Sequence, residues 1–190
     1  RFTVMAHDEW TTDVPEHAGL APARFWDRRA RGLGPTEARP SVSCGEENLL
    51  AFPGDPYAAE NILIHEFAHA IHLMGLTTTT PAFGARLSGA YRGAMKAGRW
   101  EGTYAATNPQ EYWAEGVQSY FDTNRTNDHD HGEVDTREEL LLHDPDLYAL
   151  CLEVFGANAW RYVHPSQRLG SAHLEGWRPE AAPRFAWPEE

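Results

Sequence analysis

Residues 65–69 read His65-Glu66-Phe67-Ala68-His69, an H-E-x-x-H pattern, and they decide the fold that we expect. On an α-helix, positions i and i+4 lie on one face, so both imidazoles can point at a single metal ion. Glu66 lies one position further round, where its carboxylate can reach a water molecule on that ion without binding the ion itself. Two histidine ligands and a carboxylate base form the core of a zinc hydrolase site.

The residues around the motif predict a helix that is buried in the middle of the domain. Between Ala58 and Gly75, apolar residues recur at helical spacing, and Gly75 is a typical helix end. The stretch is apolar nearly all round, as buried helices are. Buried polar side chains need partners, and a metal ion would supply one. The alternative is a core helix whose histidines are only hydrogen-bonded, but it leaves the acid at Glu66 unexplained.

Composition limits the class of protein. The chain has 190 residues, 42% of them hydrophobic, which suits one domain over residues 1–190 with a substantial core. Its formal net charge of −12 argues against a nucleic-acid partner, which would need a basic surface. No apolar run approaches the roughly 20 residues of a membrane span. Because the chain begins at Arg1 rather than Met, we expect a secreted or extracellular protein whose leader is absent from this sequence.

The two cysteines, Cys44 and Cys151, lie far apart and outside any C-x-x-C pair, so a cysteine zinc site is not expected. In an exported protein they can form one disulfide that closes a long loop. The alternative is two free thiols, one of them buried in a helix around Leu150.

A catalytic zinc usually takes three protein ligands and one water, so a third ligand is needed. The metzincin pattern requires a glycine and then a histidine after the motif, but those two positions hold His72 and Gly75. The glutamate of thermolysin-like and aminopeptidase-like proteins would fall on Ser88. His72 itself, one turn past His69, is expected to cap the helix or to pack.

A better candidate lies downstream, in Glu111-Tyr112-Trp113-Ala114-Glu115. The two acids are at i and i+4 and share a helix face. One can bind the metal while the other orients a ligand histidine by a hydrogen bond, and we expect Glu111 as the ligand and Glu115 as its support. The alternative is that Glu111 only caps the helix that Asn108 and Pro109 open.

These segments resemble the active site of the gluzincin metallopeptidases, in the family of the anthrax lethal factor catalytic domain. There, an H-E-F-x-H helix is followed by a tyrosine, six residues and a glutamate ligand within an E-aromatic-aromatic-A-E segment. Tyr104 stands in that relation to Glu111 in this chain. The match covers two short segments, which are also similar to uncharacterised secreted bacterial proteins with the same H-E-F-A-H and E-Y-W-A-E residues.

The resemblance implies a role for each matched residue. It makes His65, His69 and Glu111 the zinc ligands and Glu66 the general base. It makes Tyr104 a hydrogen-bond donor to the oxyanion or to the leaving amine, and Glu115 a support behind the ligands.

Periodicity and turn residues predict the remaining elements: strands at 2–6 and 48–52, helices at 22–31, 83–97, 108–123, 136–142 and 144–155, a loop at 77–81, a polar loop at 124–133 and an extended, packed tail after residue 164. Phe25 and Trp26 are expected core contacts of the first helix. In the polar loop, His129 and His131 are expected to be solvated. The alternative is that they rim the cleft or bind a second ion.

The expected fold is therefore α+β and zincin-like, mostly helical, with a small sheet flanking the H-E-x-x-H helix. Residues 48–52 are the expected edge strand for an extended peptide or protein substrate. The expected protein is a peptidase that holds one Zn²⁺, with a metal-activated water and Glu66 as general base. Two other functions stay open: a zinc-holding binding or structural module without turnover, and hydrolysis of a non-peptide amide.

Overall fold

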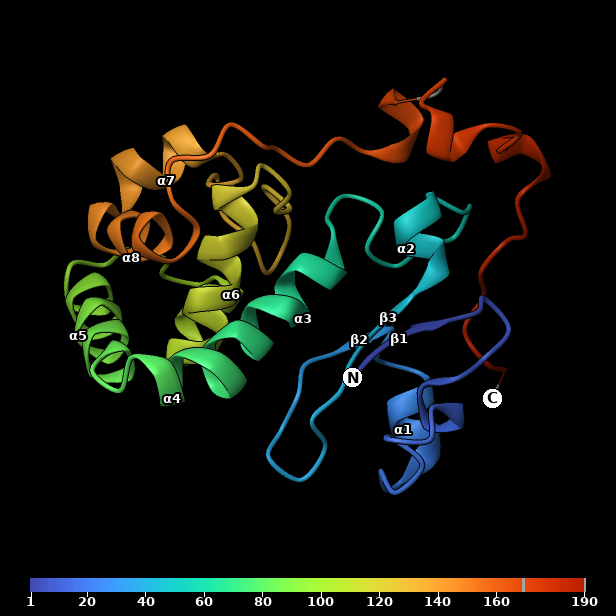
Figure 1. Cartoon of the computed structure of the whole chain (residues 1–190), viewed down its shortest axis with the longest axis horizontal. Coiled ribbons are helices and arrows are strands. Elements are labelled where there is room, and N and C mark those ends of the chain that lie inside the picture. Colours follow the sequence, from blue (N-terminus) through green and yellow to red (C-terminus); the bar gives the residue numbers. More distant parts are fainter. Residues whose placement is uncertain (169, 190) are drawn as a thin grey trace. The chain divides into compact units, whose positions relative to one another are not determined.

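The structure is a computed structural model that describes residues 1–168 and 170–189. By internal contacts the chain divides into two compact units, Arg1–Glu66 with Val163–Glu190, and Phe67–Tyr162. The division falls within the motif helix. In chain order (Figure 1) the elements are β1 (Phe2–Met5), η1 (Thr11–Asp13), α1 (Ala23–Asp27), β2 (Gly32–Leu33), β3 (Val42–Gly45), α2 (Glu46–Leu50), α3 (Ile62–Ala70), η2 (Ile71–Leu76), α4 (Thr77–Thr79), α5 (Phe83–Lys96), η3 (Tyr104–Ala106), α6 (Pro109–Tyr120), α7 (Arg137–His143), α8 (Pro145–Phe155), η4 (Pro165–Gln167), η5 (Ala172–Leu174) and η6 (Pro179–Ala181).

The α+β class is confirmed, and the sheet belongs to the first unit. Among the described residues it has three strands in the order β1-β3-β2, with β1 parallel and β2 antiparallel to β3. Strand β1 matches the predicted strand at 2–6. The central strand β3 was not predicted, because Val42-Ser43-Cys44-Gly45 is too short and too mixed to show an alternating pattern.

The predicted strand at 48–52 is wrong, because these residues belong to helix α2 and its end. Gly45 is the N-cap, and Glu46 and Glu47 occupy the first turn, where acids favour the helix dipole. Ala51 ends the helix in the left-handed conformation, with φ of 56°. The apolar residues at 49–52 therefore give no edge strand for substrate.

Asn48 fixes the loop that leads into the motif helix. Its buried side-chain amide donates to Asp55 Oδ2 (2.9 Å) and to the main-chain oxygens of Tyr57 (2.8 Å) and Glu60 (2.9 Å). Its carbonyl accepts from the main-chain nitrogen of Ile62 at 3.0 Å, the first residue of α3. One amide thus satisfies an unpaired N–H at the start of α3 and sets where that helix begins.

Arg31 links the elements of the first unit. Its guanidinium binds both carboxylate oxygens of Glu47 (2.6 and 2.9 Å) and the main-chain oxygens of Ala6 and Glu9, and both side chains of the Arg31–Glu47 pair are fully buried. The same guanidinium lies 4.8 Å from the ring of Phe185 in the C-terminal tail. The Phe185 main-chain nitrogen donates to Pro53 O at 2.9 Å. The tail is thus packed on its own unit at Phe185, but most of its described residues are exposed and it contains three short helical turns, so the predicted extended, packed tail is only partly confirmed.

Helix α1 is shorter than the predicted 22–31 and buries less. Phe25 is 53% exposed, so the expected core contact is wrong, while Trp26 is half-buried. The guanidinium of Arg29 lies over both rings, at 5.2 and 5.5 Å. A surface cluster of two aromatics and a cation takes the place of the predicted core contact.

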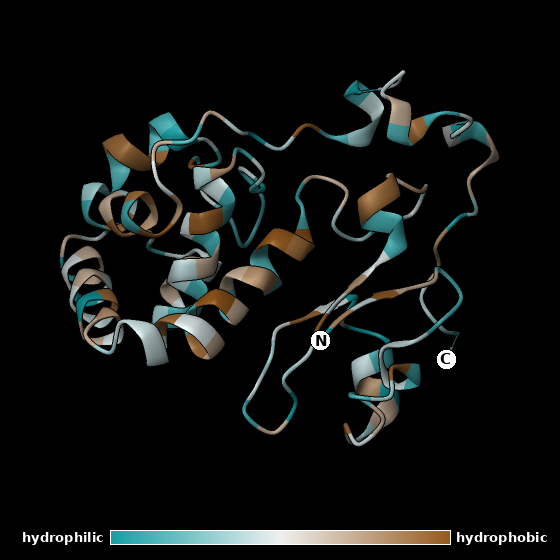
Figure 2. Cartoon of the chain, in the orientation of Figure 1, coloured by the Kyte–Doolittle hydropathy of each residue, from teal (hydrophilic) through white to brown (hydrophobic). Residues whose placement is uncertain are grey.

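The second unit is a group of helices around α6, which packs against α5, α7 and α8 (Figure 1). The Trp113 ring lies edge-on to Phe83 (5.1 Å) and stacked on Phe155 (5.9 Å), at the centre of this core. Figure 2 shows hydrophobic stretches on α3 and α8 and a mainly hydrophilic loop after α6. The predicted helices at 83–97, 108–123, 136–142 and 144–155 are confirmed within a few residues.

The motif helix does not end at Gly75, and the loop expected from Thr77 is helical in its first half. After Ala70 the chain widens into a π-helical segment, Ile71–Leu76, and continues as α4. The hydroxyls of Thr77 and Thr79 donate to Leu73 O (2.8 Å) and Gly75 O (3.1 Å), so they bind the carbonyls that a helix end leaves unpaired.

The expected disulfide is not present. Cys44 on β3 and Cys151 on α8 are free thiols, each fully buried in the core of its own unit. Burial raises the pKa of Cys44 to about 12 and that of Cys151 well above its usual value. Both thiols are therefore protonated at neutral pH.

Within the described residues, the helices are all too short or too polar to cross a membrane.

Candidate metal centre

The three predicted ligands come together in the structure. Among the described residues, His65, His69 and Glu111 form a group whose possible ligand atoms all lie within 4.8 Å of one another, and this group could hold a metal ion. Both histidines are buried on α3, one helical turn apart. His69 Nε2 lies 3.3 Å from Glu111 Oε2, with the Glu111 side chain mostly covered.

Glu111 can face His69 because another residue caps its helix. The Asn108 side chain accepts from the main-chain nitrogens of Gln110 (2.8 Å) and Glu111 (2.9 Å), and Pro109 occupies the first helical position. The cap therefore needs no carboxylate from Glu111.

The two aromatic residues after Glu111 fix α6 in place. The indole nitrogen of Trp113 donates to the main-chain oxygen of Ala68 on α3 at 3.0 Å. The Tyr112 hydroxyl donates to the fully buried carboxylate of Asp144 at 2.7 Å. Because Ala68 precedes His69 and Tyr112 follows Glu111, both bonds act directly beside the His69–Glu111 pair.

Glu66 faces the sheet of the first unit and is buried. A Cβ at Gly32 on β2 would lie 3.1 Å from Glu66 Oε1 and only 2.6 Å from Ile62 Cγ1. Position 32 must therefore be glycine for β2 to approach α3 this closely. The predicted base thus lies against the edge strand β2, not against residues 48–52.

Glu115 is buried one turn after Glu111, where loop residues hold its carboxylate. The Asn124 amide donates to Glu115 Oε2 at 3.0 Å, and His131 Nε2 lies 3.7 Å from the same oxygen. The other nitrogen of His131, Nδ1, lies 2.8 Å from Asp128 Oδ1. Burial alone would raise the pKa of Asp128, but its hydrogen bonds with His131 and neighbouring amides lower it to about 2.

His131 was therefore wrongly expected to be solvated, whereas His129 is exposed as predicted. One feature of the sequence could have indicated the buried position of His131. It lies in an acidic loop directly after the helix that carries Glu115. Nothing in the local spacing showed that the loop folds back on Glu115.

Tyr104 opens the short helix η3, which packs against α6. Its main-chain nitrogen donates to Asp130 O at 2.6 Å, and its side chain is 40% exposed. The loop of residues 124–133 therefore holds both the Tyr104 backbone and the Glu115 carboxylate. The catalytic role of Tyr104 stays a prediction.

His72 packs, as expected, and lies outside the metal-binding group. It is buried in the π-helical segment with its ring 5.8 Å from that of Phe83. Burial lowers the pKa of His72, which keeps the ring neutral at physiological pH.

Comparison with protein-family models, with curated proteins and with solved structures finds no match to this chain. Its function must be argued from the site. The donor set consists of two imidazoles and a carboxylate, and a second carboxylate is buried beside it. Such a set can hold a metal ion, and the second carboxylate is suited to act as a base on a metal-bound water.

Proposed function

We propose that the protein is a zinc-dependent peptidase of the gluzincin type. The observation that carries the proposal is the grouping of His65, His69 and Glu111, with Glu66 next to the first ligand on the same helix. A zinc site without turnover has no need of a buried acid at that position.

The donor set fits zinc better than the hard cations. Calcium and magnesium prefer oxygen ligands, whereas two imidazoles and one carboxylate are typical of catalytic zinc. Two ligands of a tetrahedral zinc are about 3.3 Å apart. The separation between His69 Nε2 and Glu111 Oε2 is also 3.3 Å. Three protein ligands leave the fourth position to water, as catalysis requires.

A bound Zn²⁺ would lower the pKa of a coordinated water to about 7 and polarise the substrate carbonyl. The residues of the chain supply the remaining steps. Glu66 accepts the proton of the attacking water and passes it to the leaving amine. Tyr104 donates its hydroxyl proton in a hydrogen bond to the oxyanion. Glu115 keeps the ligand shell oriented, and Asn124 and His131 hold its carboxylate.

The substrate in this proposal is an extended peptide or protein segment. Strand β2 takes the role expected of residues 48–52, because it is an edge strand and Gly32 lies against Glu66. An edge strand offers free main-chain groups to an extended peptide. A protein that acts on peptides outside the cell would also fit the expected export.

Two measurements test the proposal. Zinc-loaded wild-type protein is incubated with a diverse peptide library, and the products are read by mass spectrometry. The matched variant, Glu66→Gln, keeps the shape of the side chain but removes the base, so it should keep stoichiometric zinc and lose hydrolysis. A fully zinc-loaded wild type that cleaves no peptide would favour the zinc-holding module or a non-peptide amide substrate. Equal cleavage by both proteins would overturn the mechanism.

A further inference from the structure

The loop of residues 124–133, which follows α6, is folded tightly around Asp128. One oxygen of this carboxylate, Oδ1, accepts from the main-chain nitrogens of Asp130 and His131, both at 2.8 Å. The same oxygen lies 2.8 Å from His131 Nδ1. Aspartate side chains that bind nearby backbone groups in this way fix a turn locally. The loop backbone and the His131 ring are therefore held together by one oxygen atom.

His131 links this loop to Glu115 on α6. Its side chain is only 6% exposed, and its second ring nitrogen, Nε2, lies 3.7 Å from Glu115 Oε2. Asn124, also buried, donates to the same oxygen at 3.0 Å. Histidine can donate from both ring nitrogens, so one ring can serve a carboxylate on each side. A buried carboxylate is costly without donors, and the loop supplies two side chains to this one.

The contact with Glu115 is not needed to fold the loop, because the bonds to Asp128 already do so. It acts instead on α6, one helical turn after the predicted ligand Glu111. A side chain that holds the acid behind a metal ligand influences the metal without touching it.

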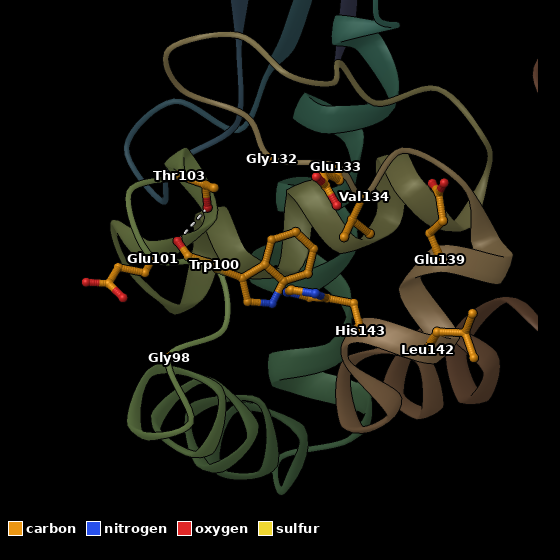
Figure 3. Close-up of a pocket in the computed structure, with 10 residues that line it drawn as sticks. All are labelled: Gly98, Trp100, Glu101, Thr103, Gly132, Glu133, Val134, Glu139, Leu142 and His143. Carbon is orange, nitrogen blue, oxygen red and sulfur yellow. Dashed lines mark hydrogen bonds between the residues drawn. The ribbon is translucent and has the colours of Figure 1, made fainter.

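The residues on either side of His131 contact the segment that carries Tyr104. Asp130 O accepts from the Tyr104 main-chain nitrogen at 2.6 Å. A Cβ at Gly132 would meet Thr103 Cγ2 at 3.4 Å, and these two residues line the pocket drawn in Figure 3. The loop therefore contacts the predicted oxyanion donor through its backbone and the predicted support acid through a side chain.

We propose that His131 is a positioning residue of the metal centre, which fixes the Glu115 carboxylate and the Tyr104 backbone together. All three residues belong to the same compact unit. The inference deepens the proposed peptidase function and rests on it for the role of Tyr104, whereas the effect through Glu115 concerns metal binding alone.

Two substitutions distinguish this role from simple anchoring of the loop. The amide nitrogen of a glutamine falls near the place of the histidine Nε2, and that of an asparagine near the place of Nδ1. His131→Gln therefore keeps a donor toward Glu115, and His131→Asn keeps one toward Asp128. The main-chain bonds to Asp128 remain in both variants, so both should fold, and denaturant unfolding of the metal-free proteins checks this.

Zinc affinity, measured by chelator competition, is the direct readout. It should fall about tenfold in His131→Asn and stay within about twofold of the wild type in His131→Gln. The control is His129→Asn, whose side chain is 86% exposed, and it should leave the affinity unchanged. Full affinity in His131→Asn, or a loss in His131→Gln as large as in His131→Asn, would overturn the assignment.

A double-mutant cycle tests whether His131 acts through Glu115. In Glu115→Gln protein, His131→Asn should have little further effect on zinc affinity, because the acid through which it acts is already changed. Losses that simply add would overturn this route.

Turnover tests the connection to Tyr104. In fully zinc-loaded protein, His131→Asn should lower kcat for a library-derived peptide by about three- to tenfold with little change in KM. The loss should be smaller when Tyr104 is already phenylalanine, because the misplaced hydroxyl is then absent. Equal losses with and without that hydroxyl would overturn the connection.

A measurement on the unaltered protein decides the matter if His131→Asn does not fold. Loading the wild type with zinc should shift the NMR signals of the His131 ring, assigned with His131→Gln, and leave those of the exposed His129 in place. Unmoved His131 signals would overturn the assignment.

The outcome is separable from that of the proposed function. If zinc affinity follows the expected pattern but no peptide is cleaved, His131 positions a metal site and the peptidase falls. If peptides are cleaved and neither His131 variant changes zinc affinity or kcat, the peptidase stands and the role of His131 falls.

Discussion

The indole nitrogen of Trp113 donates a hydrogen bond to the main-chain oxygen of Ala68, 3.0 Å away and fully buried. This bond joins α6 to the motif helix at the residue before His69. The same side chain packs on Phe83 and Phe155, so the bond and the core contacts set the same register. That register brings the Glu111 carboxylate to His69.

Trp113→Phe should therefore weaken both the fold and the metal site. The change leaves a buried carbonyl without its partner and opens a small cavity, which should lower the free energy of unfolding by about 2–4 kcal/mol. Metal affinity, measured by chelator competition, should fall with it. The control is Trp160→Phe, a side chain that is 56% exposed, and it should change stability by less than about 0.5 kcal/mol. Unchanged metal affinity in folded Trp113→Phe would show that the bond does not set the site.

Variants of Glu111 and Glu115 should show which of the two acids binds the metal and which supports the ligands. Glu111→Gln removes a charged ligand and should reduce metal affinity severely, as should His65→Ala, whereas Glu115→Gln should reduce it by about 10–100-fold. Elemental analysis and chelator competition measure both effects. The reverse order would mean that Glu115 is the ligand and Glu111 the support, and stoichiometric metal in His65→Ala would place the site elsewhere.

The grouping of His65, His69 and Glu111 could be predicted because local spacing carries most of it. One helical turn fixes the relative position of His65 and His69, and another fixes that of Glu111 and Glu115. Only the packing of the two helices against each other depends on long-range contacts. His131 could not be predicted in the same way. Its approach to Glu115 depends on how the loop of residues 124–133 folds back, and loop conformation leaves no periodic signal in the sequence.

The fold was predicted well in the helical unit and poorly around the sheet. Helix starts at Asn108, Thr136 and Asp144 carry cap residues that act locally, and all three are confirmed. Residues 48–52 were misassigned because their apolar run fits a strand or a buried helix equally well. The buried ion pair of Glu47 with Arg31 and the hydrogen bonds of Asn48 decide for the helix, and both depend on distant residues.

Gly32→Ala should damage catalysis more than metal binding. The added methyl would lie 2.6 Å from Ile62 Cγ1 and 3.1 Å from Glu66 Oε1, so the Glu66 carboxylate must shift. Turnover should fall by about 10–100-fold, and stability by about 1–3 kcal/mol, with zinc still bound. Gly93→Ala on α5, where a Cβ meets nothing within 4 Å, is the control and should stabilise the fold by up to about 1 kcal/mol. Full activity in Gly32→Ala would show that the contact does not position Glu66.

Asp135 makes the stability of the helical unit depend on pH. Burial, reinforced by the neighbouring Glu139, raises the pKa of Asp135 to about 6 from its usual 3.8. The unfolded chain therefore releases this proton at lower pH than the folded chain, and stability falls as the pH rises from about 4 to about 6. The asparagine of Asp135→Asn does not ionise, so this fall in stability should disappear. The variant should be more stable than the wild type at pH 7 by up to about 1 kcal/mol, since solvent screens the partly exposed group. Denaturant unfolding at pH 3.5 and pH 7 should show a gain only at pH 7, and an equal gain at both would contradict the assignment.

Tyr104→Phe tests the chemistry of the site at a single atom. The main-chain nitrogen that holds Tyr104 to Asp130 is untouched, and the side chain is 40% exposed, so the fold and the metal content should not change. If the hydroxyl donates to the oxyanion, its loss should lower kcat by about 10²–10³-fold with little change in KM, because the bond forms only as charge develops. Steady-state kinetics on one library-derived peptide, with zinc measured on the same samples, gives both quantities. A variant that keeps full kcat would make Tyr104 a surface residue of η3, and a variant that loses zinc would make it part of the metal site.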